Sequence, residues 1–188
     1  MPEASGIGLL LNMRRYSRQA LTRFFRSVPV FGGLEGRSLE RVISALQERE
    51  FPAGSTIFNA GELGRTMYLL AEGQVEVVCS TSDGKQISLV QLGPGECFGE
   101  MALVELQPRS ATVRVRKKAK TYSLNNMDLW NLYREDNYAY VIVLQNICRI
   151  LSRRLRKADS RISDFIAATR GGRTRRPTVQ SRKLKVES

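Results

Sequence analysis

In the first fifty residues, apolar positions recur among polar ones at the spacing of a helix. Between Leu9 and Arg26, apolar residues mix with five arginines, which predicts an amphipathic helix. Such a helix packs on the rest of the domain or, alternatively, lies on a membrane surface. A second helix is predicted over Ser38–Gln47, where apolar residues recur every three or four positions and Ser38 is the candidate N-cap.

The pattern changes between Arg49 and about Leu124. Short runs of β-branched and apolar residues alternate with Gly, Pro and Asp, and Asp83–Gly84 has the composition of a tight hairpin turn. Several short strands at this spacing indicate an antiparallel sandwich or barrel. The predicted strands are Thr56–Phe58, Met67–Ala71, Val75–Cys79, Ile87–Leu92, Ala111–Arg116 and Lys120–Leu124.

Helical spacing returns after Asn125. Asn126 is the candidate cap of a short helix, and a longer helix is predicted from about Tyr138 to Ile166. Apolar residues three or four positions apart are typical of a helix that faces a core or a second helix, so we expect a homodimer formed through this helix. They are Leu144, Ile147, Leu151, Leu155, Ala158, Ile162 and Phe165.

The chain thus divides into three predicted parts. Residues 1–25 form the N-terminal amphipathic helix, residues 26–166 the folded domain with its long helix, and residues 167–188 a basic tail. From Arg170 onward, seven Lys and Arg residues face a single Glu and few apolar residues. Such a composition buries no core, so we expect the tail to be disordered.

Composition narrows the possible chemistry. The chain of 188 residues has no histidine and only three cysteines, widely spaced, which argues against an enzyme and against a metal site. No apolar run approaches the roughly 20 residues that span a bilayer, and no secretory signal is recognised, so we expect a cytoplasmic protein. The formal net charge of +12 predicts an acidic or phosphate-bearing partner.

The most informative segment runs from Phe98 to Val113. Gly99 and Glu100 open a short helical turn, and Arg109 follows nine residues after Glu100, directly before a predicted strand. A phosphate diester is bound by backbone N–H groups at a helix start together with a guanidinium. A ribose hydroxyl needs a carboxylate acceptor, and glycine permits close approach of the backbone. The segment therefore combines groups that suit a cyclic phosphate and its ribose.

The strings Phe98-Gly-Glu-Met-Ala-Leu and Pro108-Arg-Ser-Ala-Thr-Val113 resemble the phosphate-binding cassette of the cyclic-nucleotide-binding domain family. Further matches are Phe51–Glu62 and Met67–Val77, so that the resemblance covers roughly residues 24–165. It implies an α+β fold, in which a jelly-roll-like antiparallel β-roll of about eight strands is flanked by N-terminal helices and a long C-terminal lid helix.

The resemblance also implies the roles of individual residues. Glu100 would accept a hydrogen bond from the ribose 2′-hydroxyl, and Arg109 would pair with the cyclic phosphate. Backbone N–H groups of Ala102, Ser110 and Ala111, with the Ser110 hydroxyl, would complete the cradle. The candidate ligand-binding residues are Gly99, Glu100, Met101, Ala102, Arg109, Ser110, Ala111 and Arg154.

The long helix departs from the pattern of the catabolite-activator branch of the family. Ala158 and Asp159 stand where that branch caps adenine with a Thr-Ser pair, so cyclic AMP and cyclic GMP both remain candidate ligands. Arg154 stands where that branch places an arginine near the residue equivalent to Glu100, although a solvated surface arginine is an alternative. Because only about 20 polar and basic residues follow the helix, we expect no sequence-specific DNA binding.

The leading hypothesis is a stand-alone cyclic-nucleotide sensor that changes conformation on ligand binding and regulates an unknown downstream protein. One alternative is a protein that binds nucleic acid or anionic membranes through its basic termini and keeps a vestigial nucleotide pocket. Another is a phosphodiesterase, against which the lack of histidine and of metal-ligand clusters argues. The sequence predicts no catalytic residue, no metal and no cofactor beside the nucleotide ligand.

Overall fold

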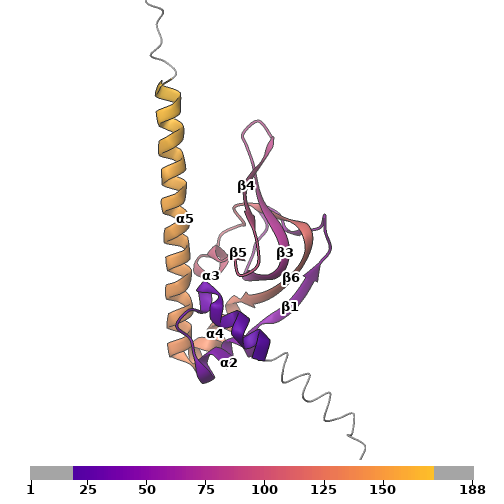
Figure 1. The fold of residues 1–188 in the computed structure, drawn as a ribbon, viewed down its shortest axis with the longest axis vertical. Helices are drawn as coiled ribbons and strands as arrows, with labels where there is room; N and C mark the ends of the chain where they lie inside the picture. Colours follow the sequence, from indigo (N-terminus) through magenta and orange to yellow (C-terminus); the bar gives the residue numbers. More distant parts are fainter. Residues whose placement is uncertain (1–18, 172–188) are drawn as a thin grey trace, which may run out of the picture. The chain divides into compact units, whose positions relative to one another are not determined.

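The computed structural model describes residues 19–171. Its internal contacts divide the chain into two units, Met1–Ile150 and Leu151–Ser188. The first unit holds the strands and the shorter helices, and the second holds the distal part of the long helix (Figure 1). The predicted N-terminal helix is described over residues 19–27, and the predicted basic tail lies outside the described residues from position 172 onward.

An antiparallel sheet forms the body of the first unit and curls into a roll (Figure 1). Its strands follow the order β1-β6-β3-β4, while β2 pairs with β6 and β5 pairs with β3. The predicted α+β fold built on a β-roll is thereby confirmed. The six strands of the described residues are β1 Gln47–Phe51, β2 Thr56–Phe58, β3 Thr66–Ser80, β4 Gln86–Leu92, β5 Cys97–Phe98 and β6 Thr112–Asn125.

Two of the strands are longer than the sequence pattern indicated. The predicted strands on either side of Gly73 are one continuous strand, β3, and the last two predicted strands unite in the same way in β6. The β3–β6 register shifts around Gly73, whose φ is +89°. A Cβ atom at this position would lie 2.1 Å from the carbonyl oxygen of Lys118. Glycine therefore lets the paired strands bend without a break, which reduces the expected number of about eight strands to six.

The predicted Asp83–Gly84 hairpin is confirmed between β3 and β4. Gly84 has a φ of +79°, and the backbone N–H of Thr81 donates to the carbonyl oxygen of Lys85 over 2.8 Å. A positive φ is accessible to glycine without steric cost, which explains why the chain reverses here.

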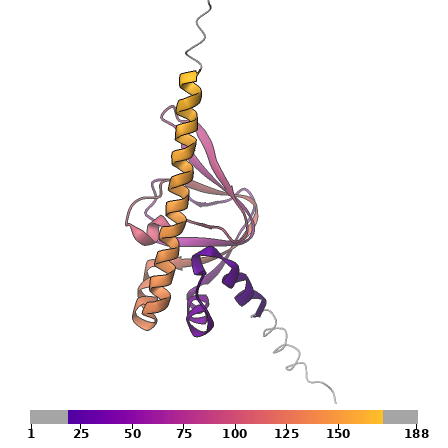
Figure 2. The same ribbon diagram turned by 60° about the vertical axis from the view of Figure 1, so that its left-hand side comes forward.

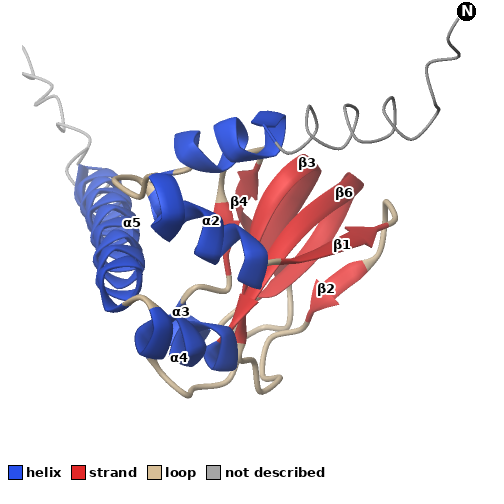
Figure 3. Cartoon of the chain, turned by 90° about the horizontal axis from the view of Figure 1, so that it is seen from below, coloured by secondary structure: helices blue, strands red, loops and turns tan. Residues whose placement is uncertain are grey.

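Helices flank the roll on one side. Figure 3 shows α2, α3 and α4 gathered beside the strands, and Figure 2 shows the indigo helix of residues 19–27 together with α2 below them. The helices described here are η1 Pro29–Phe31, α2 Gly36–Ala45, α3 Met101–Val104, α4 Asn126–Glu135 and α5 Asn137–Gly171.

The apolar core lies inside the roll and extends under the first helices. Leu70, Val75 and Phe98 are buried there, and each contributes about 1.5–3 kcal/mol relative to exposure. Phe25 is fully buried, and its ring meets that of Tyr122 edge to face at a centroid distance of 4.9 Å. The described part of the N-terminal helix is therefore packed on the domain, and the predicted boundary after residue 25 falls inside this helix.

Two predicted helix caps differ from the structure. Ser38 lies inside α2, whose N-cap is Glu35, and the Ser38 hydroxyl donates instead to Asp136 Oδ2 over 2.8 Å. The cap of α4 is Asn125, one residue before the predicted Asn126. Asn125 accepts hydrogen bonds from two backbone N–H groups, and Asp128 accepts one from the N–H of Asn125 in return. This reciprocal capping box favours Asn125 over its identical neighbour.

The proximal part of α5 is anchored to the first helices. Ala139, Val143 and Ile147 are fully buried on one face, and the Asn146 side chain donates to the carbonyl oxygens of Val30 and Gly32 over 3.2 and 2.8 Å. The helix runs five residues beyond the predicted end at Ile166.

Asp136 forms the joint between α4 and α5. Its carboxylate accepts hydrogen bonds from Ser38 and from the backbone N–H of Ala139, and it lies 3.3 Å from Nη1 of Arg41. Burial opposes its ionisation, but these hydrogen bonds and the positive charge of Arg41 lower the pKa of Asp136 below its ordinary value of 3.8. The joint thus depends on a negative charge.

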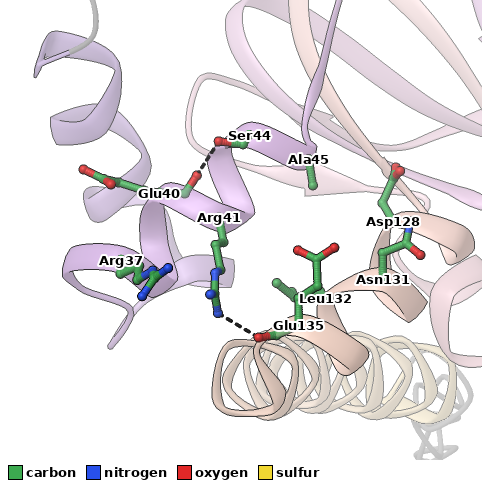
Figure 4. A pocket seen from close by; sticks show the side chains of 9 residues that line it. All are labelled: Arg37, Glu40, Arg41, Ser44, Ala45, Asp128, Asn131, Leu132 and Glu135. Carbon is green, nitrogen blue, oxygen red and sulfur yellow. Dashed lines mark hydrogen bonds between the residues drawn. The ribbon is translucent and has the colours of Figure 1, made fainter.

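A cleft of about 440 Å³ opens between α2 and α4 beside this joint (Figure 4). Figure 4 shows Arg41 of α2 reaching toward Glu135, whose carbonyl oxygen accepts a hydrogen bond from Nη1 over 2.7 Å. The cleft carries charges of both signs, and Arg41 already serves to connect α2 to the end of α4.

We predict that the joint weakens in acid. Because the pKa of Asp136 is lower in the folded than in the unfolded state, its contribution is present above about pH 3.8 and is lost as the pH falls through the folded value. Asp136→Asn keeps a capping oxygen but removes the charge, and Asp136→Ala removes both. We expect losses of about 1 and about 2 kcal/mol at neutral pH, measured by urea unfolding.

Exposed Asp164 of α5 provides the control. Asp164→Asn should leave the urea midpoint and its pH dependence unchanged. A pH profile of Asp136→Asn identical to that of the unaltered protein would contradict the role of Asp136.

Candidate functional site

The segment singled out in the sequence forms a turn between β5 and β6. Phe98 pairs with Tyr68 of β3, the chain reverses at Gly99, and the four-residue helix α3 follows. Gly99 has a φ of +71°, and a Cβ atom there would lie 2.6 Å from Nη1 of Arg109. The predicted helical turn at Met101–Leu103 is confirmed.

The backbone of Arg109 is held by the loop between β2 and β3. Its N–H donates to the carbonyl oxygen of Glu62, and its carbonyl oxygen accepts from the N–H of Gly61, both over 2.8 Å. An isolated bridge between Leu63 and Pro108 continues this pairing. These backbone hydrogen bonds fix the position of Arg109 independently of its side-chain contacts.

The guanidinium of Arg109 is buried among groups from β2, β3 and the turn after β5. Nη1 donates to the carbonyl oxygen of Gly99 over 3.1 Å, and Nη2 donates to that of Thr66 over 2.7 Å. Cζ lies 4.0 Å from the centroid of the Phe58 ring. The residue is only 9% exposed, and its Nε atom is buried without a hydrogen-bond partner. A buried donor without an acceptor is rare in folded proteins and calls for an explanation.

The site contains charges of both signs. Burial lowers the pKa of the Arg109 guanidinium, while the carboxylates of Glu62 and Glu100 act in the opposite direction. Glu100 is itself buried, with 3% of its surface exposed. The site thus brings together a buried cation and a buried acid, the two charged groups that the sequence predicted.

The remaining predicted residues of the turn surround these two. Ala102 is buried, Met101 is 43% exposed, and the N–H of Ala102 already donates to the carbonyl oxygen of Gly99 over 3.2 Å. Ser110 is exposed and Ala111 is buried. Among the described residues, no backbone carbonyl accepts a hydrogen bond from the N–H of Ser110 or Ala111. Both N–H groups therefore remain candidates for a phosphate.

Arg154 belongs to a different part of the chain. It is an exposed residue of α5 in the second unit, after Ile150. Its predicted position near Glu100 stays a prediction.

Three supporting residues were missed by sequence reasoning. Phe58 lies under the guanidinium, Thr66 offers a carbonyl oxygen, and Gly64 leaves space for the side chain of Arg109. A Cβ atom on Gly64 would lie 2.1 Å from Nε of Arg109. Each of the three lies more than forty positions from Arg109 in the chain. The only sequence signal for any of them was Gly64, the glycine in the turn before β3.

Two absences hold for the described part of the chain. Over residues 19–171, no group of three or more His, Cys, Asp or Glu side chains is arranged to hold a metal ion. Within the same range, no helix combines the length and the apolar character that crossing a membrane requires. The cysteines at positions 79, 97 and 148 form no disulfide bond.

Comparison with known proteins identifies the class to which this fold and site belong. Residues 48–136 match the family model of the cyclic nucleotide-binding domain. The chain belongs to this family, as the resemblance of its cassette predicted.

The chain is similar to several regulators and channels. It is 36% identical over 135 residues to the cyclic AMP receptor protein of Thermus thermophilus, a match that covers 70% of this chain and 59% of that protein. The crystal structure of the catabolite activator protein of Thermus thermophilus superposes with a TM-score of 0.66 and 34% identity, over 74% of this chain and 63% of that one. A cyclic nucleotide-gated potassium channel of Mesorhizobium japonicum is 39% identical over 102 residues, which are 54% of this chain and 27% of the channel. The chain thus spans less than two thirds of the length of these relatives.

We predict that Gly64→Ala destabilises the site by overpacking. The new methyl group would collide with the Arg109 guanidinium, and moving that guanidinium breaks its two hydrogen bonds. The expected loss is about 1–3 kcal/mol in the free energy of unfolding, measured by urea titration. Gly93→Ala is the matched control, because a Cβ atom at Gly93 has nothing within 4 Å. Equal stability of the two variants would contradict the steric role of Gly64.

Proposed function

We propose that this protein is a cyclic-nucleotide sensor that binds cyclic AMP or cyclic GMP, changes conformation and regulates a partner protein. The observation that carries the proposal is the unpartnered Nε–H of Arg109. Two carbonyl oxygens hold the terminal nitrogens of this guanidinium, and its buried Nε–H has no acceptor in the protein. Gly64 packs against Nε, so in this proposal the guanidinium shifts from its buried position to pair with an oxygen of the cyclic phosphate.

The other groups of the site complete this fit. The free N–H groups of Ser110 and Ala111 suit the same phosphate, and the carboxylate of Glu100 suits the ribose 2′-hydroxyl. The names of the relatives, a cyclic AMP receptor protein and a cyclic nucleotide-gated channel, point to the same class of ligand. In this proposal the protein acts by binding and carries out no reaction on the nucleotide.

A ligand changes the conformation of a protein only if it binds one of two conformations more tightly than the other. The equilibrium shifts only by the ratio of the affinities of the two states for the nucleotide. We place the movable part at the joint of α4 and α5, because the cassette helix α3 packs against α4 and Asp136 connects the two longer helices.

We predict that Arg109→Ala lowers the affinity for cyclic nucleotide at least about hundredfold, since removing one partner of a buried charge pair costs about 2–5 kcal/mol. Isothermal titration of the unaltered protein with cyclic AMP and with cyclic GMP gives the reference affinities and identifies the preferred base. Arg109→Lys should also bind weakly, because an ammonium cannot span the carbonyl oxygens of Thr66 and Gly99 and still reach a phosphate.

Arg116→Ala is the matched control. Arg116 lies on β6, the strand that follows Arg109 in the chain, pairs with Glu76 over 3.6 Å and is largely exposed, so its loss should leave the affinity unchanged. The absence of heat and of thermal stabilisation with either nucleotide would exclude the proposed function, and equal binding by Arg109→Ala would exclude the proposed site.

We also propose that a second copy of the chain pairs along the distal part of α5. Residues Leu155, Ile162 and Phe165 are 63%, 58% and 72% exposed and lie at intervals of seven and three. This spacing places them on one face of the helix, and exposed apolar stripes of this kind are typical of paired helices. Cationic side chains occupy the remaining faces, including Arg153, Arg156 and Lys157.

We predict that Phe165→Glu raises the dissociation constant of this dimer by at least about tenfold, because it places a charge in an apolar contact. Sedimentation equilibrium measures the effect. Ser163→Glu adds the same charge at an exposed polar position away from the stripe and should leave the dimer intact. A monomeric unaltered protein at every concentration, with and without nucleotide, would contradict the dimer.

A further inference from the structure

Aromatic side chains form an exposed surface on α4 and the start of α5. Trp130 and Tyr133 are 54% and 43% exposed, and their rings stack at a centroid distance of 5.4 Å. Tyr140 meets Tyr133 edge to face at 5.2 Å, and Met127 next to them is 65% exposed. Neighbouring exposed aromatic residues are unusual on a protein surface, and Trp, Tyr, Met and Arg are the residues enriched in protein interfaces.

A hollow of about 510 Å³ borders this surface. It is lined by Arg65, Asn125, Asn126, Met127 and Trp130. Its walls are mainly apolar, and it has the size of a site for a few side chains. The hollow and the ring stack share Trp130, so an occupant of the hollow also contacts the aromatic surface.

Asn126 ties the hollow to the start of β3. Its backbone N–H donates to the carbonyl oxygen of Arg65 over 3.0 Å. This hydrogen bond fixes the two lining residues relative to each other, while Oδ1 of Asn126 is buried and has no hydrogen-bond partner.

Arg65 gives the hollow a positive charge. Its side chain is exposed and forms no ion pair with any residue of the described range, in contrast to Arg41, which pairs with Asp136, and Arg116, which pairs with Glu76. The charge is therefore available to an external carboxylate. The net charge of +12 attracts acidic segments to the whole protein.

We propose that this hollow binds a short acidic and apolar peptide segment of a partner protein. An apolar side chain of the segment packs against Trp130 and Met127, and a carboxylate pairs with Arg65. The segment docks in the absence of nucleotide as well, and the proposal rests on the proposed function only in that the segment belongs to the regulated partner.

Tryptophan fluorescence tests the proposal directly, because Trp130 is the only tryptophan of the chain. A phage-displayed library of random dodecapeptides is selected on the unaltered protein and depleted on Arg65→Glu. We expect enriched peptides that carry an acidic residue beside an apolar one. Synthesised and titrated without nucleotide, they should shift the emission of Trp130, and Arg65→Glu should weaken them at least about tenfold.

One variant keeps the result specific. Arg37→Glu makes the same charge change at an exposed position of α2 and should bind the peptides as the unaltered protein does. The peptide titrations contain no nucleotide, so a failure of the proposed nucleotide site leaves this test unaffected.

The proposal is overturned if no peptide is enriched, if the enriched peptides lack acidic residues, or if they bind without changing the emission of Trp130. Equal loss of binding in Arg65→Glu and Arg37→Glu would also overturn it, because the attraction would then be a property of the net charge. Selection of peptides that resemble a segment of this chain would assign the surface to a second copy instead.

Discussion

The rest of the structure is organised around the burial of one guanidinium. Taking an arginine out of water is costly unless its donors find acceptors, and Arg109 finds them in the carbonyl oxygens of Gly99 and Thr66. The ring of Phe58 packs against the guanidinium, and the absence of a side chain on Gly64 leaves room for it. These supports satisfy the terminal nitrogens and leave Nε unpaired. The proposed anion site thus starts from a cation whose position is set by the protein and which keeps one donor without an acceptor.

The supports of Arg109 come from parts of the chain that only the β-roll brings together. Thr66 begins β3, Phe58 ends β2, and Gly99 follows β5. The bend of β3 and β6 at Gly73 closes the roll, and the loop at Gly61 and Glu62 then pairs with the backbone of Arg109. Each contact is weak by comparison with the hydrophobic core, yet together they fix the direction of one side chain. The β-roll therefore contributes to the site chiefly by orienting the side chain of Arg109.

The hydrophobic pattern predicted the elements better than their ends. β2 has the predicted bounds, and the Phe98–Val113 segment folds as its glycine and helix signals indicated. Strands on either side of Gly73 were separated in the prediction, because a glycine that ends a strand and one that bends it look alike in sequence. Ser38 was predicted to be an N-cap, but its hydroxyl donates a hydrogen bond to Asp136, almost a hundred residues away. Gly64 and Thr66 were missed for the same reason, since a backbone carbonyl or an absent methyl group has no compositional signature.

The proposed nucleotide site and the aromatic surface meet at two consecutive residues. The carbonyl oxygen of Thr66 accepts a hydrogen bond from Arg109, and that of Arg65 accepts one from the N–H of Asn126 at the start of α4. The peptide groups that carry these two carbonyl oxygens are joined through Cα of Thr66. A backbone rotation at Thr66 that improves one hydrogen bond therefore changes the geometry of the other. Binding free energies coupled in this way act equally in both directions. If both proposals hold, a peptide held at Arg65 should therefore change the affinity for nucleotide by the same factor as nucleotide changes the affinity for the peptide.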